Sequence, residues 1–294
     1  MQAVLILAHK DIDQLLQLTK RLNGVFEVYI HIDKKAQITN HQQDVLNALP
    51  HVHWISTQNV HWGAWSIVQA TIDLMNLALK KSDNKYFHLI SGQDWPVKRP
   101  QEICDFFSGN NKLYIWNYES AKYRKSGEPL VDWQKFYFNY DKINRRSTYG
   151  KIYHRVSIIL QTIFRINKLK KLGINLTLYN GSQWVDLPRD AVEYLISYLN
   201  ANQSVLQMFK TGFCSDEFWI PTILRNNPLF AARIDTNNYR YIDWHKKHDS
   251  FPAILDENDF SKILNSGKLF MRKVRFPESS KLINELDEVN KYES

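Results

Sequence analysis

Residues Tyr86–Val97 read YFHLISGQDWPV, six strand-forming residues that run into a polar turn at Gly92 and Pro96. An unbroken apolar run bounded by turn residues is typical of a strand that is covered on both faces. Two similar runs precede it, the short apolar segment Val4–Leu7 and the β-branched and aromatic segment Val25–Ile32. The first part of the chain therefore predicts a set of buried, parallel strands.

Helical segments separate these strands. Asp11 stands at the start of a helix that we expect to run to Leu22, and apolar residues recur at helical spacing over Trp65–Leu79. A further short strand is expected over Val52–Ser56. Strands that alternate with helices predict an α/β fold with a Rossmann-like sheet, and ligands of such sheets bind beyond the carboxyl ends of the strands.

Composition narrows the class of protein. The 294 residues include 38 Lys+Arg and 30 Asp+Glu, a formal charge of +8, with 44% hydrophobic and 23% charged residues. These values are ordinary for a folded domain and exclude a disordered tail, a collagen and a coiled coil. Two cysteines cannot form a disulfide framework and suit a reducing compartment. Because no apolar run approaches the ~20 residues of a membrane span and no secretory leader is visible, we expect a cytoplasmic protein.

The middle of the chain is strongly basic. Between Lys142 and Lys171 there are nine Lys/Arg and no Asp/Glu, interleaved with apolar residues. This pattern predicts a basic amphipathic helix with flanking loops. Two interpretations stay open: a solvated basic face above a core stripe, or a contact surface for anionic lipid or a lipid-linked acceptor. Nucleic acid is a weaker third alternative, because the sequence contains no recognised nucleic-acid-binding motif.

Several familiar motifs are absent. The sequence contains no GxGxxG, P-loop, CxxC pair, HExxH or GxSxG. Their absence disfavours dinucleotide, Walker-type phosphate, structural zinc and serine-nucleophile sites. The only Asp-x-Asp, Asp11–Asp13, lies at a helix start, so we interpret it as a helix cap rather than a metal site. No metal cofactor is expected.

Four parts of the sequence carry polar residues where chemistry is expected. Trp62–Gln69 begins a helix after a strand, and Tyr86–Val97 ends in its polar turn. Ser215–Glu217 places two acids at a helix start. Arg240 and Lys273 lie in aromatic or apolar, strand-like surroundings near the end of the chain.

Together with their neighbours, these segments resemble the core-2/I-branching β-1,6-N-acetylglucosaminyltransferase family (glycosyltransferase family 14), which includes the peptide O-xylosyltransferases. The resemblance extends from Ala3 to Val274 and is weak between Glu119 and Tyr179. The matching pieces, in chain order, are Tyr29–Ala36 (YIHIDKKA), Ala64–Ala70 (AWSIVQA), Ser91–Pro96 (SGQDWP), Gly181–Trp184 (GSQW), Asp216-Glu217, Tyr239–Trp244 (YRYIDW) and Leu269–Lys273 (LFMRK). Their common order and spacing make a chance match improbable.

The resemblance implies a GT-A fold, a Rossmann-like mixed sheet with helices on both faces. It also implies inverting transfer of a sugar from a UDP-sugar to an acceptor hydroxyl, without a divalent metal. Within a single catalytic domain of residues 1–294, it places a nucleotide-sugar-binding half at 1–115, a basic, variable insertion at 116–180, an acceptor and catalytic half at 181–278 and a polar tail at 279–294. Animal members of the family carry a luminal membrane anchor and several disulfides. Because this sequence shows neither feature, we expect it to be a bacterial, cytoplasmic member.

The resemblance also assigns the reacting groups. Glu217 matches the family's catalytic base, and Asp216 is expected to be a helix cap or a neighbour that raises the pKa of that base. Arg240 and Lys273 are expected to neutralise the departing diphosphate in place of a metal ion, since arginine grips two phosphate oxygens and lysine adds a mobile charge.

Further residues are expected to shape the donor and acceptor sites. By the same resemblance, the expected nucleotide-binding residues are His9, Asp33, Trp65 and Ser66, and the residues expected to shape the donor and acceptor sites are Asp94, Trp184, Asp216 and Glu119. Other interpretations stay open: His9 could equally be an ordinary surface histidine, and Asp33 could be an acidic residue of a turn. Trp65 and Trp184 equally suit core positions.

These inferences lead to one favoured function and one main alternative. We expect transfer of N-acetylglucosamine from its UDP derivative, with UDP-xylose as the second choice of donor, to a glycan acceptor that includes lipid-linked precursors. The basic region 142–171 would hold the enzyme at the inner face of an anionic membrane. The main alternative is a non-catalytic nucleotide- or carbohydrate-binding protein on the same scaffold. No nucleic-acid partner is expected.

Overall fold

A computed structural model describes residues 1–290, whose centre is a seven-stranded sheet in the order β12-β6-β11-β4-β1-β2-β3. Its strands are β1 (Gln2–Ala8), β2 (Glu27–Ile32), β3 (Val52–Ile55), β4 (Tyr86–Ser91), β6 (Leu113–Tyr114), β11 (Asp186–Pro188) and β12 (Ile234–Asp235). β1 pairs in parallel with β2 and β4, whereas β11 runs antiparallel to β4 and β6. The predicted strands are confirmed to within two residues, and the sheet is mixed.

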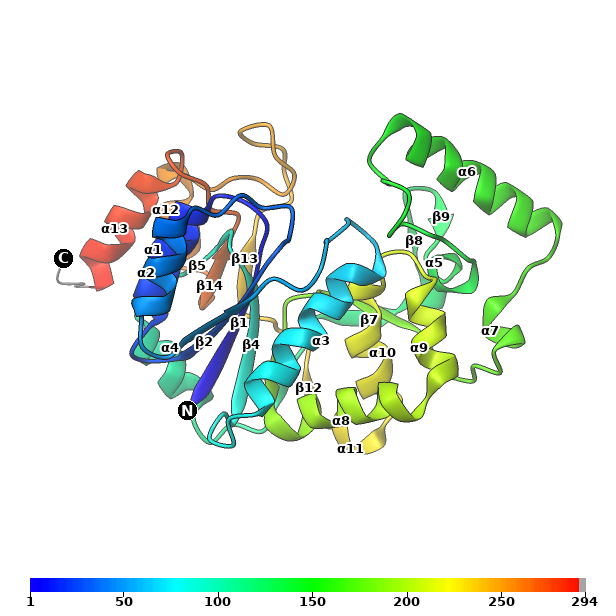
Figure 1. The fold of residues 1–294 in the computed structure, drawn as a ribbon, viewed down its shortest axis with the longest axis horizontal. Coiled ribbons are helices and arrows are strands. Elements are labelled where there is room, and N and C mark those ends of the chain that lie inside the picture. Colours follow the sequence, from blue (N-terminus) through cyan, green and yellow to red (C-terminus); the bar gives the residue numbers. More distant parts are fainter. Residues whose placement is uncertain (291–294) are drawn as a thin grey trace.

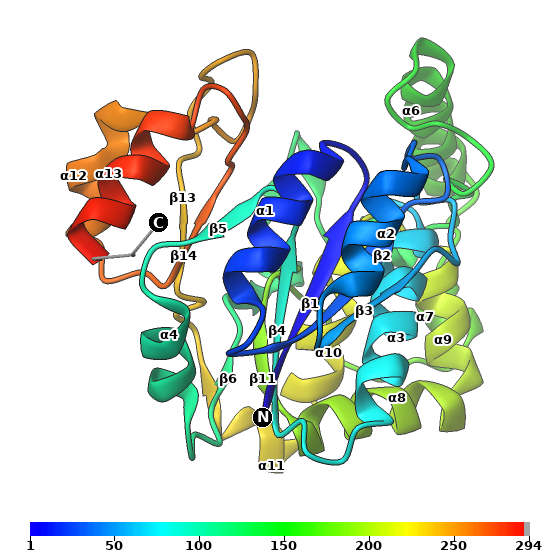
Figure 2. The same cartoon turned by 60° about the vertical axis from the view of Figure 1, so that its left-hand side comes forward.

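Helices cover both faces of this sheet (Figures 1 and 2). One face carries α1 (Ile12–Leu22), α2 (Asn40–Ala48), α4 (Pro100–Phe107), α12 (Phe260–Leu264) and α13 (Ser280–Asn290), and the other carries α3 (Trp65–Leu79), α8 (Arg189–Ala201), α9 (Gln203–Lys210) and α10 (Trp219–Arg225). Successive side chains of a strand point to opposite faces. In β1, Val4 and Ile6 therefore join one core cluster and Ala3 and Leu5 the other.

A small second sheet lies beside the large one (Figure 2). It consists of β13 (Arg240–Ile242), β14 (Phe270–Arg272) and β5 (Asp94–Pro96), with β14 parallel to β13 and antiparallel to β5. The register of β14 and β5 sets Arg272 opposite Asp94. This sheet brings the turn after β4 together with two segments from the end of the chain.

The region 116–180, expected to be a basic, variable insertion, contributes side chains to the core. It contains β7 (Asn117–Glu119), β8 (Arg124–Lys125), β9 (Glu128–Pro129), α5 (Asp132–Lys135), α6 (Thr148–Ile163), α7 (Lys168–Lys171) and β10 (Tyr179–Gly181). Trp133, Phe136 and Phe138 are buried in the core beside α9 and α10. The predicted basic amphipathic helix α6 projects from the body and is joined to it along one side (Figures 1 and 2). Lys168 does not belong to a solvated basic face, because its side chain is buried and its ammonium donates to the carbonyl of Met208.

The structure corrects two sequence predictions, the helix cap at Asp11 and the polar tail from residue 279. Asp11 occupies the N-cap position of α1, but its φ of 53° is left-handed and its side chain makes no cap hydrogen bond. The expected polar tail forms α13, which buries Leu282, Ile283 and Leu286 in the core. The rest of that tail, 291–294, lies outside the described residues.

The charged centre of the large sheet is Asp186, whose side chain is completely buried beside that of Arg240. The Arg240 guanidinium donates to both carboxylate oxygens, and His88 contacts one of them at 2.8 Å through Nδ1. Burial alone would raise the pKa of Asp186, but Arg240 and His88 hold it below its ordinary value. The ion pair joins β13 to β11 and β4, so it fixes the small sheet against the large one.

Arg240→Met is expected to lower the free energy of unfolding by about 3–5 kcal/mol, because it leaves Asp186 buried without its countercharge. Denaturant unfolding measures this loss. The matched control is Arg233→Met, whose partner Asp190 is 54% exposed, and which we expect to cost at most about 1 kcal/mol. Equal losses for the two variants would contradict the structural role of Arg240.

Candidate functional site

Polar side chains gather where β1, β2 and β4 end. His9 and Lys10 follow β1, Asp33 follows β2, and Ser91 ends β4. The carboxyl ends of these parallel strands are neighbours, since β1 lies between β2 and β4. Desolvation by neighbouring groups lowers the pKa of His9, although the residue is exposed, and Lys10 and Arg272 lower it further while Asp33 opposes them. These charges therefore act on one another across the strand ends.

Arg272 is held in one position at the end of β14. Its Nη1 donates to Asp94 Oδ1 at 2.8 Å and to the hydroxyl of Ser91. Its guanidinium lies over the ring of Trp184, 4.5 Å from the ring centroid. Asp94 is itself completely buried, and its other oxygen accepts from the Ser91 amide at 2.7 Å. The expected donor-site residues Asp94 and Trp184 thus act here on an arginine, which they orient.

Lys273 adds a second cation to this group. Burial lowers the pKa of Lys273 to about 8, and the charges of Arg272, Arg146 and Lys10 contribute to this shift, while Asp94 opposes it. Within residues 1–290 no carboxylate lies at ion-pair distance from the Lys273 ammonium. Arg272 is paired with Asp94, whereas Lys273 adds a positive charge that no carboxylate balances, and this excess of positive charge favours an anion.

Glu217 lies in a second polar group, on a 3₁₀ turn that spans Ser215–Glu217 and precedes α10. Its Oε2 accepts from Lys125 Nζ at 3.1 Å and from Asn180 Nδ2 at 3.3 Å. The carboxylate side chain is 27% exposed, so it keeps access to solvent. Lys125 and Asn180 hold it in a defined direction.

Asp216 is a neighbour of this carboxylate and not a helix cap. No side-chain cap bond is present at the turn or at α10, where Phe218 occupies the N-cap. Asp216 Oδ1 is buried without a hydrogen-bond partner, although the residue as a whole is partly exposed. Burial, reinforced by the charge of Glu217, raises the pKa of Asp216 to about 7.

Close packing fixes the turn that carries both acids. Cys214, just before it, has a left-handed φ of 50° and donates its amide to the carbonyl of Gly63 at 2.9 Å. Gly63 has a φ of 73°, and a Cβ there would lie 2.6 Å from the ring of Phe213. A glycine is therefore required where the loop before α3 meets this turn.

Two contacts connect the cationic group to the acidic one. Asn180 bonds Glu217, and Trp184, four residues later, stacks on Arg272. Four residues of extended chain span at most about 14 Å. In addition, the Arg146 guanidinium, whose charge acts on Lys273, lies 5.0 Å from the ring of Trp62 in the loop before α3. The segment Asn180–Trp184 therefore links the two groups, which lie in the same region of the molecule.

Arg240 does not belong to either group, which corrects the expected diphosphate role of this residue. Its side chain is completely buried, and Asp186 occupies its guanidinium together with the carbonyl of Asn238. Arg272, which was not singled out in the sequence, lies beside Lys273 instead.

The expected nucleotide residues hold a loop in place. Asp33 Oδ1 accepts from the amide of Val60 at 3.2 Å, and Ser66 Oγ accepts from the amide of His61 at 2.9 Å. Trp65 is 8% exposed and packs in the core. These contacts shape the segment between β3 and α3, at the same strand ends as His9.

Glu119 lies near the acidic group. It ends β7, which pairs antiparallel with β10 and sets Tyr118 opposite Asn180. Its carboxylate forms an ion pair with Lys122 at 2.7 Å and is 31% exposed. The expected acceptor contact is therefore close to the strand that orients Glu217.

Sequence reasoning missed several residues of the site for different reasons. Arg272 could have been recognised from the sequence, because it directly precedes Lys273 in the segment Leu269–Lys273. Lys125, Arg146 and Asn180 belong to or border the weakly resembling region, where no motif distinguishes them from surface polar residues.

Residues 1–290 contain no group of three or more His, Cys, Asp or Glu side chains placed to hold a metal ion. In the same part of the chain, no helix combines the length and the apolar character needed to cross a membrane.

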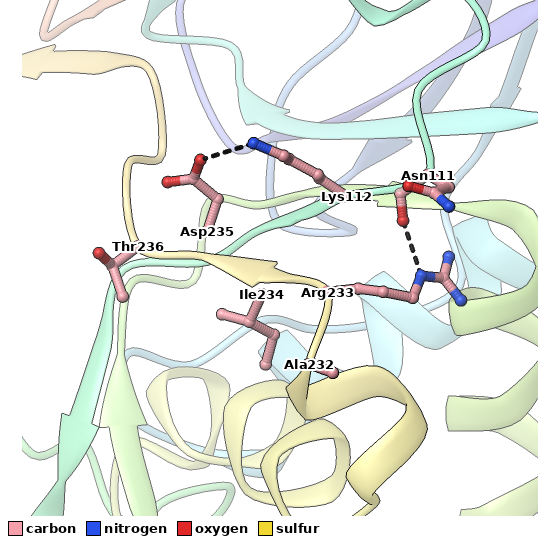
Figure 3. A pocket seen from close by; sticks show the side chains of 7 residues that line it. All are labelled: Asn111, Lys112, Ala232, Arg233, Ile234, Asp235 and Thr236. Carbon is pink, nitrogen blue, oxygen red and sulfur yellow. Dashed lines mark hydrogen bonds and ion pairs between the residues drawn. The ribbon is translucent and has the colours of Figure 1, made fainter.

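A surface hollow elsewhere does not offer comparable chemistry (Figure 3). It is lined by residues around β12, beside α11 (Pro228–Ala231), at the end of the molecule where the N-terminus lies (Figure 1). Its cations are paired, Lys112 with Asp235 at 3.6 Å and Arg233 with Asp190. It therefore lacks the uncompensated charge found at Lys273.

Comparison with known proteins gives one family. The sequence model of the Core-2/I-Branching enzyme family matches residues 3–264. The xylosyltransferase sqv-6 of Caenorhabditis briggsae is 25% identical over 78% of this chain and 26% of that protein. The β-glucuronosyltransferase GlcAT14A of Arabidopsis thaliana is 21% identical over 84% of this chain and 54% of that protein.

A human relative belongs to the same group of matches. The human β-1,3-galactosyl-O-glycosyl-glycoprotein β-1,6-N-acetylglucosaminyltransferase 3 is 23% identical over 80% of this chain and 52% of that protein. The chain thus spans between about a quarter and about half the length of these curated relatives.

Asp216→Asn is expected to flatten the pH dependence of folding stability. Because the folded state binds the Asp216 proton more tightly than the unfolded state does, the free energy of unfolding falls as pH rises from about 4 to 7, by roughly 2–4 kcal/mol. The asparagine variant lacks this loss. Denaturant unfolding at pH 5 and pH 8 measures it, with Asp249→Asn, whose side chain is 98% exposed, as the matched control. The idea fails if the Asp216→Asn protein loses as much stability between the two pH values as the unaltered protein.

Proposed function

We propose that this chain, which belongs to the Core-2/I-Branching enzyme family, is an inverting glycosyltransferase that moves a sugar from a UDP-sugar to a glycan hydroxyl without a divalent metal. Membership of the family makes it a glycosyltransferase of GT-A fold, in agreement with the mixed sheet covered by helices on both faces. The observation that carries the rest of the proposal is the pair of cations, Arg272 and Lys273, and their connection through the segment Asn180–Trp184 to the carboxylate of Glu217.

The cations suit a departing diphosphate. Two phosphates leaving together need positive charge close by, and a partly buried site strengthens that attraction. Arg272 is pre-positioned by Asp94, Ser91 and Trp184, so it loses little freedom when an anion binds. Lys273 supplies a second charge that no carboxylate within residues 1–290 neutralises. Arg272 therefore takes the part that the sequence suggested for Arg240.

Glu217 suits the general base. Inversion requires a carboxylate that takes the proton from the attacking hydroxyl while UDP leaves from the opposite face of the sugar. Lys125 and Asn180 orient the Glu217 carboxylate, which remains accessible to an acceptor. Glu119, on the neighbouring strand β7, is placed to contact that acceptor.

The nucleotide is assigned to the ends of β1 and β2. His9 and Asp33 lie there, on the side of the cationic group. Trp65 and Ser66 would act indirectly, through the loop that they hold in place. Trp184 offers at most one ring face to a sugar, because Arg272 covers the other.

N-acetylglucosamine is the donor sugar that we favour, as in the human relative's name, with xylose and glucuronic acid as the alternatives that the other relatives' names carry. A screen that measures UDP release from each UDP-sugar, with a panel of glycan acceptors, decides among them. The absence of UDP release with every donor, combined with retained UDP binding, would favour the non-catalytic alternative.

Glu217→Gln is expected to lower kcat about 10²–10⁴-fold, because the amide cannot accept the acceptor's proton. UDP affinity should change less than about twofold, since the diphosphate cations are untouched. Steady-state UDP release and calorimetric UDP binding measure the two effects. The matched control is Glu193→Gln, a half-exposed glutamate on α8 that pairs with Arg189, and it should leave both values unchanged. Full turnover by Glu217→Gln would remove the base from the mechanism.

Lys273→Met is expected to weaken UDP binding about 10–100-fold at pH 7, the value of a charge-assisted hydrogen bond. In the unaltered protein, UDP affinity should fall as pH rises through about 8, because the Lys273 ammonium loses its proton in that range. The methionine variant should lack this fall between pH 7 and pH 9. Lys268→Met is the control, since the Lys268 ammonium bonds Asn237 instead.

Metal removal provides a second arm of this experiment. Because the proposal assigns the diphosphate to Arg272 and Lys273, EDTA should leave both UDP affinity and turnover unchanged. Strong inhibition by EDTA that Mn²⁺ reverses would contradict the proposal, as would a Lys273→Met protein with unaltered affinity.

A further inference from the structure

The helix α6 exposes more apolar surface than any other element of comparable length among the described residues. Of the sixteen exposed large apolar side chains within residues 1–290, seven lie in or directly after it. They are Tyr149, Ile152, Val156, Ile159, Leu160, Ile163 and Phe164, each between 47% and 71% exposed. An apolar patch of this kind on a folded protein marks an interaction surface.

These side chains form one stripe. Tyr149, Ile152, Val156, Ile159 and Ile163 follow one another at intervals of three or four residues. At 3.6 residues per turn, such intervals confine the exposed apolar side chains to an arc of about 100°. The stripe faces outward along nearly the whole helix.

The opposite side of α6 is firmly attached to the body. His154 is buried, with Nδ1 against the hydroxyl of Tyr140 and Nε2 3.0 Å from Glu128. The amide of Gln161 bonds both the N–H and the carbonyl of Tyr137, at 2.7 and 2.9 Å. The helix therefore presents its apolar stripe in a fixed direction, and rotating the stripe inward would break these bonds.

Exposed positive charge accompanies the stripe on α6 and on the segment that follows it. The exposed cations of α6 and of the segment after it are Lys151, Arg155, Arg165, Lys170 and Lys171. Between Lys142 and Lys171 the sequence has no acidic residue. A partner that covers this part of the molecule should therefore accept apolar side chains and offer negative charge to the nearby cations.

We infer that α6 docks the protein on an anionic phospholipid bilayer, with its apolar stripe in the headgroup and acyl boundary and its basic side chains on the lipid phosphates. A second copy of this chain is a poorer partner, because pairing two α6 stripes would bring two sets of uncompensated cations together. A nucleic acid would leave the apolar stripe unpartnered.

Docking through α6 would also orient the candidate site. α6 projects on the side of the molecule toward which the carboxyl ends of β1 and β4 point (Figures 1 and 2). Arg146, just before α6, acts electrostatically on Lys273. A docked protein would thus hold its site near acceptors at the bilayer surface, a consequence that rests on the proposed function, whereas docking itself does not.

Co-sedimentation with vesicles tests the inference. The full chain should bind vesicles of phosphatidylcholine and phosphatidylglycerol in equal parts, bind vesicles of phosphatidylcholine alone at least about tenfold more weakly, and lose anionic affinity as salt rises. The double variant Ile159→Ser/Ile163→Ser, which removes apolar insertion, should weaken binding about tenfold or more. The double variant Lys151→Glu/Arg155→Glu should do the same through charge.

Control variants separate bilayer docking from a general loss of folding. Leu229→Ser changes a large apolar side chain that is 77% exposed, on α11 at the opposite end of the molecule, and should leave vesicle binding unchanged. Thermal unfolding and UDP binding report whether each variant is folded, and neither requires catalytic activity. If the serine variant does not fold, the charge variant decides the question, because both of its side chains are exposed.

Three results would overturn the inference. The first is the absence of vesicle binding, and the second is equal binding to neutral and anionic vesicles. The third is a concentration-dependent dimer, seen by light scattering, that the serine variant abolishes while vesicle binding persists. Failure of the proposed function would appear separately, as absent UDP release with intact vesicle binding.

Discussion

The ion pair between Asp186 and Arg240 determines how the two sheets of this protein meet. A carboxylate without solvent contact needs a countercharge, and Arg240 meets that need from a strand of the other sheet. β13 carries Arg240 at its start and pairs in parallel with β14, and β14 ends at Arg272. Arg240 lies opposite Phe270 in this ladder, and Arg272 follows Phe270 by two residues. The buried ion pair therefore fixes the strand β14, which presents Arg272 and then Lys273 near the ends of the large sheet's strands.

Arg240 and Arg272, at opposite ends of the short β13–β14 ladder, therefore have different roles. Arg240 is sealed inside and stabilises the junction of the sheets, whereas Arg272 reaches the edge and borders an uncompensated lysine. The ion pairs formed by Asp94 and Asp186 also differ in the exposure of the arginine. Asp186 pairs with a completely buried arginine, whereas Asp94 orients an arginine that still reaches solvent. The first pair can therefore only stabilise the fold, and the second can position its arginine for a ligand.

The acidic half of the site depends on the region that the sequence described least well. Lys125 and Asn180, which orient Glu217, come from strands β8 and β10 on either side of α6. The first part of this region is also core, because Trp133 and its aromatic neighbours pack against Phe213, just before the turn that carries Glu217. The segment is thus structural near the site and projects only at α6.

Apolar patterns in the sequence determined the alternating strands and helices and the helix α6, because these depend on residues close together in the chain. The sequence also placed Asp216 and Glu217 at the start of a helix, where the structure has a 3₁₀ turn before α10. Its motifs were also sufficient to indicate the family. Tertiary structure alone decided which arginine is buried, that Asp11 caps nothing through its side chain, and that Lys125 and Asn180 meet Glu217. Arg240 and Arg272 occupy similar strand-like surroundings in the sequence, so their difference depends on whether a distant carboxylate, Asp186, faces one of them. Such a pairing joins residues 54 positions apart, and no local pattern records it.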